Sequence, residues 1–272
     1  MKNKNLIITG STRGLGLAYA NYFSSKGYNL FLTDISEKAC EAFNTGTTLD
    51  KILTKLRSFG GKVHYQSADL TDQKNANDII AEAKIKFNSI DGLIANAGGD
   101  ISGSDARASG GKASNNTFMI QYEEFNNIFD RNFKTCLHTL RSVVPVMKEQ
   151  KYGKIITVSS INASFGVSKE TTYSIAKSAI VQLSRSLAKE LREFNINVNC
   201  IMPGPVRTER FLSTVKDRHK HDTQLLDNKE GLMRIAETED ICPVVEFLIS
   251  SNSNFISGEV IKIDGGLFPQ PV

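Results

Sequence analysis

Tyr173 and Lys177 are the first candidates for chemistry, because they lie four positions apart in the stretch Tyr-Ser-Ile-Ala-Lys. On a helix this spacing puts both side chains on one face. A tyrosine phenol ionises near pH ~10, too high for ready proton exchange at neutrality, but a close positive charge favours the phenolate and lowers its pKa. The pair is therefore a candidate acid/base device. Both residue types are also common on solvated helix faces, so the interpretation depends on motifs elsewhere in the chain.

Short apolar runs alternate along the chain with longer segments of helical periodicity, which is typical of strand, helix, strand units around a parallel sheet. The predicted strands are Leu6–Thr9, Asn29–Thr33, Lys62–Gln66, Gly92–Ala95, Lys154–Ser159, Asn197–Ile201 and Val260–Ile263. The predicted helices include Leu15–Lys26, Gln73–Phe87, Phe125–Lys148 and Thr171–Phe194. One apolar stripe in the last of these, which we assign to the core or to a subunit interface, consists of Ile175, Ala179, Leu183, Leu187 and Leu191.

Length and composition favour one domain covering residues 1–272, since 40% apolar content can bury a sizeable core. The net charge of +4 is spread along the chain with no basic stripe, so no nucleic-acid partner is expected. The four cysteines are scattered, which argues against a disulfide framework and against a metal site. The chain shows no signal peptide and no run of about 18 apolar residues, so we expect no membrane association and a cytoplasmic location.

Two stretches interrupt the alternation of strands and helices. Residues 99–120 are rich in Gly, Ser and Asn, which predicts a loop insertion. Residues 207–231 are highly charged and are predicted to form a helical flap over a site. Long loops within compact domains are often functional, although a solvated, tolerated insertion is the alternative for both.

A glycine-rich turn, Thr-Gly-Ser-Thr-Arg-Gly-Leu-Gly, directly follows the first predicted strand and precedes the first predicted helix. Its glycines are Gly10, Gly14 and Gly16. Glycine lets a backbone turn tightly and approach a pyrophosphate, whose charge is favoured by free amides at a helix N-terminus. The position between strand and helix favours nucleotide binding over an ordinary tight turn.

Asp34 ends the second predicted strand, about 20 residues past the glycines, where a carboxylate can accept hydrogen bonds from the adenosine ribose hydroxyls. It would repel a phosphate on that ribose, so Asp34 favours NAD over NADP. Arg13 in the turn could pair with such a phosphate and favours the opposite. Asp34 could also serve as an N-cap or turn residue.

These motifs together resemble the short-chain dehydrogenase/reductase family, and the resemblance extends from the first strand to Asp264-Gly265-Gly266. Asn132 resembles the family's catalytic asparagine, and Ser160, thirteen residues before Tyr173, its catalytic serine. Ser159 is one position off and is interpreted as structural. The segments that resemble the family's other cofactor contacts are Asp69-Leu70, Asn96-Ala97-Gly98 and Pro203-Gly204-Pro205-Val206-Arg207-Thr208.

The resemblance implies a Rossmann-like, doubly wound α/β fold with a mostly parallel, seven-stranded sheet and helices on both faces. It implies an oxidoreductase that acts on a secondary alcohol or ketone, as a homotetramer or homodimer. The implied catalytic residues are Asn132, Ser160, Tyr173 and Lys177. The implied NAD-binding residues are Gly10, Ser11, Thr12, Arg13, Gly14, Leu15, Gly16, Asp34, Asp69, Leu70, Asn96, Ala97, Gly98, Tyr173, Lys177, Pro203, Gly204, Val206 and Thr208.

Two alternatives remain open at this point. One is an NADPH-dependent enzyme like the family's 3-ketoacyl-(acyl carrier protein) reductases, which Arg13 permits and Asp34 opposes. The other is a catalytically silent, dinucleotide-sensing protein, since a fold can be kept while its chemistry is lost. The complete set of four catalytic residue types disfavours this second alternative.

Overall fold

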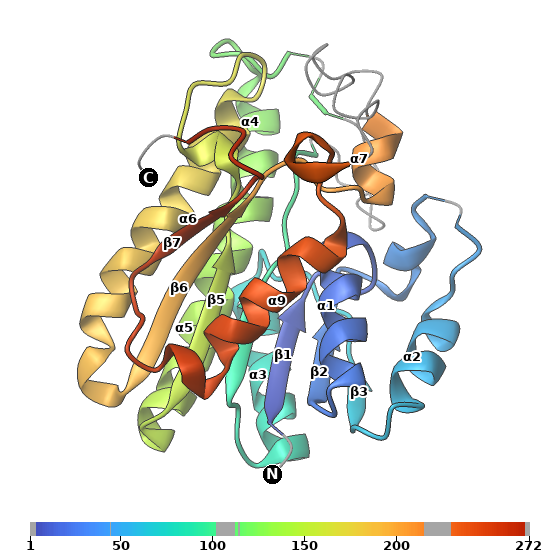
Figure 1. Ribbon diagram of the computed structural model, residues 1–272, viewed down its shortest axis with the longest axis vertical. Coiled ribbons are helices and arrows are strands. Elements are labelled where there is room, and N and C mark those ends of the chain that lie inside the picture. The colour runs from blue at the N-terminus through green and yellow to red at the C-terminus, as the bar shows by residue number, and fades with distance from the viewer. Residues whose placement is uncertain (1–3, 44, 102–111, 114, 215–229, 270–272) are drawn as a thin grey trace.

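One seven-stranded parallel sheet forms the centre of the computed structural model, which describes residues 4–43, 45–101, 112–113, 115–214 and 230–269. The strand order is β3-β2-β1-β4-β5-β6-β7 (Figure 1). The strands are β1 Asn5–Thr9, β2 Asn29–Thr33, β3 Val63–Tyr65, β4 Gly92–Ala95, β5 Gly153–Val158, β6 Ile196–Pro203 and β7 Val260–Ile263. Every neighbouring pair is parallel, which confirms the predicted fold class.

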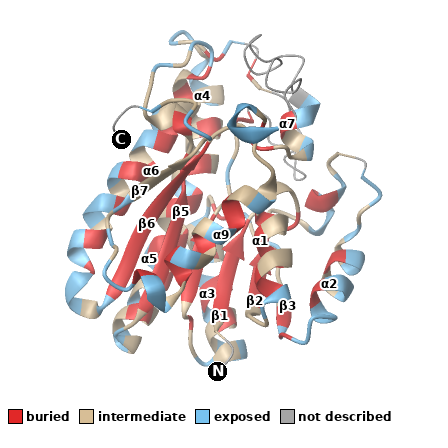
Figure 2. Cartoon of the chain, in the orientation of Figure 1, coloured by how far each residue is buried: buried red, intermediate tan, exposed pale blue. Residues whose placement is uncertain are grey.

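Helices cover both faces of this sheet. The helices are α1 Gly14–Ser25, α2 Leu49–Arg57, α3 Gln73–Phe87, α4 Tyr122–Phe129, α5 Thr135–Gln150, α6 Thr171–Glu190, α7 Glu209–Thr214 and α9 Thr238–Ile249. Along β1, Ile7 packs with α3, α5 and α6, whereas Leu6 and Ile8 pack with α1, α2 and α9. Both faces of the central strands are therefore buried (Figure 2), as expected for a parallel sheet between two helical layers.

The predicted helix at Phe125–Lys148 is a continuous helical stretch from α4 to α5, joined by a π-helical turn at Asp130–Lys134. Asn132 lies within this turn and is completely buried. π-helical turns inside α-helices are often found at functional sites.

The apolar stripe predicted on the helix at Thr171–Phe194 lies partly in the core, since Leu191 is buried and Leu183 and Leu187 pack against the core. Ile175, by contrast, is 46% exposed, and the sheet-facing side of α6 also includes residues such as Ala176, Ile180 and Ser184. Ser184 is tolerated in the core because its hydroxyl lies 2.6 Å from that of Thr157 and donates to the carbonyl of Ile180. Hydrogen bonding thus lets a polar residue lie on the buried face of the helix, which a pattern of apolar residues alone does not predict.

The carboxyl ends of β1 and β4 lie at the point where the strand order reverses. In open parallel sheets, ligands bind in the crevice outside such a switch point. Gly10 directly follows β1 and Asn96 directly follows β4. The fold thus brings the glycine turn and the Asn96-Ala97-Gly98 turn to one edge of the sheet.

The two irregular stretches are described only in part. Residues 102–111 and 114 of the predicted insertion, and 215–229 of the predicted flap, lie outside the described residues. In the described part of the flap, α7 is followed, beyond the gap, by a short 3-10 turn at Gly231–Met233.

Candidate active site

A cavity of about 650 Å³ opens at the carboxyl ends of the strands, within the range of roughly 300–1,000 Å³ that is usual for ligand sites. Most of the predicted site residues line it, namely Gly10, Arg13, Gly14, Leu15, Asp34, Asp69, Leu70, Asn96, Ala97, Gly98, Ser160, Tyr173, Lys177, Pro203, Gly204, Val206 and Thr208. Four of the predicted residues are not in its lining: Ser11, Thr12, Gly16 and Asn132.

Two glycines of the turn serve packing within the protein. A Cβ at Gly16 would lie 1.9 Å from the carbonyl oxygen of Gly10, and one at Gly10 would lie 2.9 Å from the Cα of Ala97. The side-chain amide of Asn96 donates to the carbonyls of Thr9 and Gly10, at 3.1 Å each. Asn96 therefore holds the glycine turn against the turn that follows β4.

Gly14 is the glycine of the turn that faces both the cavity and the start of α1. Gly14 has φ +50 degrees and Gly10 has φ +62 degrees, so both adopt the left-handed conformation that favours glycine. Arg13 occupies the N-cap position of α1, and its side chain makes no capping hydrogen bond. A helix N-terminus without a side-chain cap presents amides and positive potential to an anion. The turn thus fits a pyrophosphate.

Ser11 and Thr12 point away from the cavity. The Ser11 hydroxyl donates to the carbonyl of Thr33 at 3.1 Å. The amide and hydroxyl of Thr12 both donate to Asp34 Oδ2, at 3.1 and 2.7 Å. These side chains fasten the glycine turn to the end of β2, a role that motif spacing does not reveal.

Asp34 is only 7% exposed, and its Oδ1 accepts a further hydrogen bond from the amide of Ile35 at 2.9 Å. A carboxylate offers about four acceptor positions, so these three donors leave room for about one more. Beside it, Arg13 Nη1 donates to the carbonyl of Ala39 at 3.4 Å, and its guanidinium lies 5.6 Å from the ring centre of Phe43. Phe43 also lines the cavity and was not predicted.

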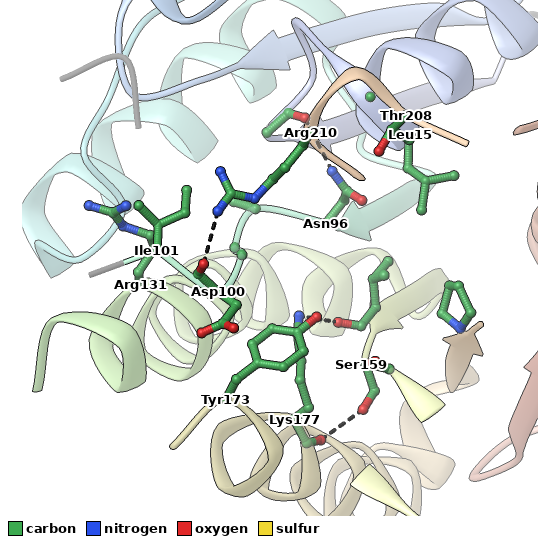
Figure 3. A pocket seen from close by; sticks show the side chains of 18 of the residues that line it. Leu15, Asn96, Asp100, Ile101, Arg131, Ser159, Tyr173, Lys177, Thr208 and Arg210 are labelled. Atoms are coloured by element: carbon green, nitrogen blue, oxygen red, sulfur yellow. Dashed lines mark hydrogen bonds between the residues drawn. The ribbon is translucent and has the colours of Figure 1, made fainter. Parts of the chain in front are cut away.

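Tyr173 and Lys177 lie together in the cavity wall, as their spacing predicts (Figure 3). Lys177 Nζ is 5.6 Å from the centre of the Tyr173 ring and donates to the carbonyl of Val158 at 2.9 Å. Lys177 is 4% exposed, and this burial lowers its pKa from 10.5 to about 8.

The two neighbouring serines both line the cavity but have different hydrogen-bond partners. The Ser159 hydroxyl is 3% exposed and donates to the carbonyl of Lys177 at 2.8 Å (Figure 3). Ser160 begins the 3-10 turn Ile161–Ala163 and accepts from the amide of Asn162 at 3.3 Å. A phenol, an ammonium and a hydroxyl in one cavity wall can exchange a proton with a substrate oxygen and stabilise charge on it.

Asn132 lies behind the cavity wall. Its Oδ1 accepts from the amide of Gly99 at 2.9 Å, and its Nδ2 donates to the carbonyls of Gly99 and Ile128 at 3.0 and 2.8 Å. A Cβ at Gly98 would lie 2.7 Å from this Oδ1 and 3.5 Å from Lys177 Nζ. The Asn132 side chain therefore anchors the turn after β4 beside Lys177.

Thr208 caps α7, because its hydroxyl accepts from the amide of Phe211 at 3.2 Å. A Cβ at Gly14 would lie 3.7 Å from the Thr208 side chain, so the start of α7 stands opposite the glycine turn. Asp69 is exposed at the cavity rim, where its Oδ1 accepts from both the amide and the hydroxyl of Thr71.

Several cavity residues were missed by sequence reasoning because they come from distant segments. Arg210 Nη2 donates to the carbonyl of Asp100 at 2.9 Å (Figure 3), and burial, assisted by nearby Arg13, lowers the pKa of Arg210 to about 10. The rings of Phe165 and Phe268 stack with centres 4.0 Å apart. The other unpredicted residues of the lining include Ile101, Lys112, Asn162, Val167, Glu170, Phe211 and Leu267.

Within the described part of the chain, no group of three or more His, Cys, Asp or Glu side chains could hold a metal ion. Among the described helices, none has the length and apolarity needed to cross a bilayer. The four cysteines are all buried, and none forms a disulfide.

The chain is similar to many dehydrogenases and reductases. A family model described as "Enoyl-(Acyl carrier protein) reductase" matches residues 10–268. A cyclohexanol dehydrogenase from a Rhodococcus species is 30% identical, with 98% of this chain and 97% of that protein covered. A 3-oxoacyl-[acyl-carrier-protein] reductase from Haemophilus influenzae is also 30% identical, with 98% and 99% covered.

Among solved structures, a 7α-hydroxysteroid dehydrogenase complexed with NADH and 7-oxo glycochenodeoxycholic acid matches with a TM-score of 0.82 at 25% identity. The match covers 97% of this chain and 93% of that chain. The family model spans the glycine turn, the Tyr173–Lys177 pair and the Phe268 wall of the cavity. On these grounds the chain belongs to the short-chain dehydrogenase/reductase family of oxidoreductases.

Proposed function

We propose that this protein transfers a hydride between NAD(H) and a secondary alcohol or ketone. The proposal rests on one observation: the glycine turn and Asp34 line the same cavity as Ser160, Tyr173 and Lys177. The similarity to a cyclohexanol dehydrogenase supports a CH-OH group as the site of reaction.

Bound nicotinamide would supply or accept the hydride, so the protein must position the substrate and handle one proton on its oxygen. Tyr173 donates that proton during reduction and, as the phenolate, removes it during oxidation. The Lys177 ammonium favours the phenolate and is placed to bond the nicotinamide ribose. Ser160 donates a hydrogen bond to the substrate oxygen, where charge develops in the transition state.

Asn132 acts in this scheme by fixing the turn at Gly98 and Gly99 next to Lys177, where a water can link the ammonium to solvent. Its three side-chain hydrogen bonds support this positioning. The glycine turn holds the pyrophosphate, and Asp34 holds the adenosine ribose. The remaining cofactor contacts are those predicted from the sequence that line the cavity.

NAD is the proposed cofactor because Asp34 lies in the cavity wall with acceptor capacity left. The second candidate is an NADPH-dependent 3-ketoacyl-(acyl carrier protein) reductase, which is favoured by Arg13 in the same wall and by the similarity to the Haemophilus influenzae enzyme. A silent dinucleotide-binding protein is the third.

The test measures the dissociation constants of NADH and NADPH, then turnover with a panel of secondary alcohols, ketones and 3-ketoacyl thioesters. We expect NADH to bind at least tenfold more tightly than NADPH, and Arg13→Ala to weaken NADPH binding by a larger factor than NADH binding. Tighter NADPH binding with turnover of ketoacyl thioesters would select the second candidate. Tight binding of either dinucleotide without turnover of any panel member would select the third.

We also propose a homotetramer or homodimer, one domain over residues 1–272, and a cytoplasmic location. Exposed apolar side chains near α4 and on α6 support the oligomer. They are Phe118 at 85% exposure, Met119 at 71%, Tyr122 at 77% and Ile175 at 46%. Residues 99–120 would form an added wall of the substrate cleft and 207–231 a flap over it.

A further inference from the structure

A cluster of ionic and amide side chains, here called the Lys112 cluster, contributes all its members except Asn116 to the cavity lining but has no part in the chemistry described above. It consists of Asp100, Lys112, Asn116, Asn162 and Glu170. Lys112 Nζ lies 3.2 Å from Asp100 Oδ2 and also bonds Glu170 Oε1. The side-chain amide of Asn116 donates to Asp100 Oδ1 at 3.0 Å, and that of Asn162 donates to Glu170 Oε2.

The cluster joins the three chain segments that carry the proposed active site. Glu170 is the N-cap residue of α6, three positions before Tyr173, yet its carboxylate makes no capping hydrogen bond and is directed to Lys112 and Asn162. The amide of Asn162 bonds the Ser160 hydroxyl oxygen at 3.3 Å. Glu170 thus connects the start of the tyrosine helix with the serine segment, and Lys112 holds this Glu170 carboxylate from the other side.

Asp100 adds the third segment. It directly follows Gly99, which Asn132 holds, and its backbone carbonyl accepts from Arg210 of α7. Asp100 and Tyr173 both line the cavity (Figure 3), and both act on the charge of Arg210. The position of this loop relative to Tyr173 therefore depends on the same ammonium.

The charges of the cluster are buried enough for their balance to matter. The side chains of Lys112, Asp100 and Glu170 are 18%, 9% and 11% exposed. Burial raises the pKa of Asp100, while Lys112 opposes this rise, Glu170 adds to it and Arg210 also opposes it. Exposed ion pairs contribute little, whereas removing one partner of a buried pair leaves an uncompensated charge at high cost.

We propose that Lys112 is a positioning residue, which bridges Asp100 and Glu170 and thereby holds Ser160 and Tyr173 in register for the substrate oxygen. This inference rests on the proposed function for its kinetic consequence. Its electrostatic consequence is independent of turnover, because any change of charge in the cluster must also act on the Tyr173 phenol.

The kinetic test compares Lys112→Met with Lys112→Met/Glu170→Gln, which restores the charge balance. The control is Lys74→Met, which removes an exposed ion pair with Asp78 on α3. At pH 8 we expect Lys112→Met to lower kcat at least tenfold with the dissociation constant of NADH within about twofold. The double variant should recover at least a third of the parental kcat, and the control should not differ from the parent.

The pH profile separates positioning from simple loss of stability. Without Lys112 the pKa of Asp100 rises further, so lowering the pH neutralises this carboxyl and relieves its repulsion of Glu170. The ratio of variant to parental kcat should therefore rise at least threefold between pH 8 and pH 6. A ratio that is constant with pH, or a double variant no better than the single one, would overturn the proposal.

A spectroscopic titration tests the inference even if the parent turns over no substrate. The ionisation of Tyr173 is read as the difference in ultraviolet absorbance between each protein and its Tyr173→Phe counterpart. The charged groups that line the cavity with Tyr173 are Lys177 of α6, Glu170 at the α6 N-cap, Glu209 and Arg210 of α7, Asp100 and Lys112 after β4, Asp130 and Arg131 of the π-helical turn, Arg13 of the glycine turn, Asp34 after β2 and Asp69 after β3.

Lys112→Met removes a positive charge and should raise the Tyr173 ionisation midpoint, whereas Glu170→Gln removes a negative charge and should lower it. A shift of roughly half to one pH unit in each direction is expected for one charge near the phenol. Glu170→Gln keeps this test decisive if Lys112→Met does not fold. Midpoints that do not move, or that move in the same direction, would overturn the proposal, while an inactive parent would refute only the proposed function.

Discussion

Replacing Lys177 with methionine should make the protein more stable while it abolishes activity. Burial lowers the pKa of Lys177 from 10.5 to about 8. Since one pKa unit corresponds to ~1.4 kcal/mol, keeping this side chain charged at pH 7 lowers the free energy of unfolding by about 3 kcal/mol. Methionine has similar length and carries no charge. The loss of the hydrogen bond to the Val158 carbonyl offsets about 1–2 kcal/mol. The net gain is then about 1–2 kcal/mol, or roughly 2–6 °C in Tm for a chain of this size.

The gain should depend on pH in a defined direction. Because the pKa of Lys177 is lower in the folded than in the unfolded state, the parent becomes more stable as the pH rises from about 8 to about 10.5, where only the unfolded chain keeps the proton. The advantage of Lys177→Met is therefore complete below pH 8 and disappears by about pH 10.5. Urea unfolding followed by circular dichroism at pH 6.5 and pH 10 measures both values.

Lys189→Met is the matched control, since Lys189 is exposed on the same helix. It should change the free energy of unfolding by less than about 0.5 kcal/mol at either pH. A Lys177→Met protein that is less stable than the parent at pH 6.5, or that differs from it equally at both pH values, would refute the argument from burial.

Substitutions in the turn, in the serine pair and at the buried asparagine test the other assignments. Gly16→Ala should disrupt the glycine turn, measured as a lower Tm in calorimetry, and prevent NADH binding, because its Cβ would lie 1.9 Å from a backbone oxygen. In Gly14→Ala the Cβ meets nothing closer than 3.7 Å, so this substitution should lower the free energy of unfolding by only about 1–2 kcal/mol, because of the positive φ. Ser160→Ala should lower kcat by about 10²-fold and cost at most about 1 kcal/mol for the lost hydrogen bond from the Asn162 amide, whereas Ser159→Ala should lower the free energy of unfolding by about 1 kcal/mol with little effect on kcat. Asn132→Ala should lower the free energy of urea unfolding by about 2–4 kcal/mol, because it leaves both backbone groups of the turn after β4 without their partner.

The strands could be predicted because their signal is local. A parallel strand buried on both faces reads as a short apolar run, and Asn29–Thr33 and Gly92–Ala95 have the predicted limits, as does the partly buried Val260–Ile263. The helices α2 and α9 were not predicted. Helix α2 has only nine residues, and α9 contains Pro243, which is ordinarily a sign that a helix ends.

The site was predictable where one element positions both partners, as α6 does for Tyr173 and Lys177. It was not predictable where partners meet only in the fold. Arg210 and Asp100 are 110 positions apart, and nothing local to either indicates their contact. Lys112 lies in a stretch whose glycines indicate only a loop, so its buried pairing depends on tertiary structure.

Motif spacing also does not tell which residues of a motif face the ligand. Ser11, Thr12 and Gly16 occupy positions of the cofactor motif, yet they fasten the turn to β2 and α1 and do not line the cavity. Asn132 similarly lies behind the wall that it supports. The direction of a side chain at a sharp turn is set by packing that is absent from the sequence pattern.

Tyr173→Phe tests the central claim most directly, because it removes one oxygen atom and keeps the ring beside Lys177. Hydride transfer is followed in a single turnover by NADH absorbance, with NADH binding and Tm measured on the same sample. The account predicts a rate at least about 10³-fold below that of the parent, with NADH affinity within about twofold and an unchanged Tm. A rate within tenfold of the parent would contradict the assignment of Tyr173 as the proton carrier.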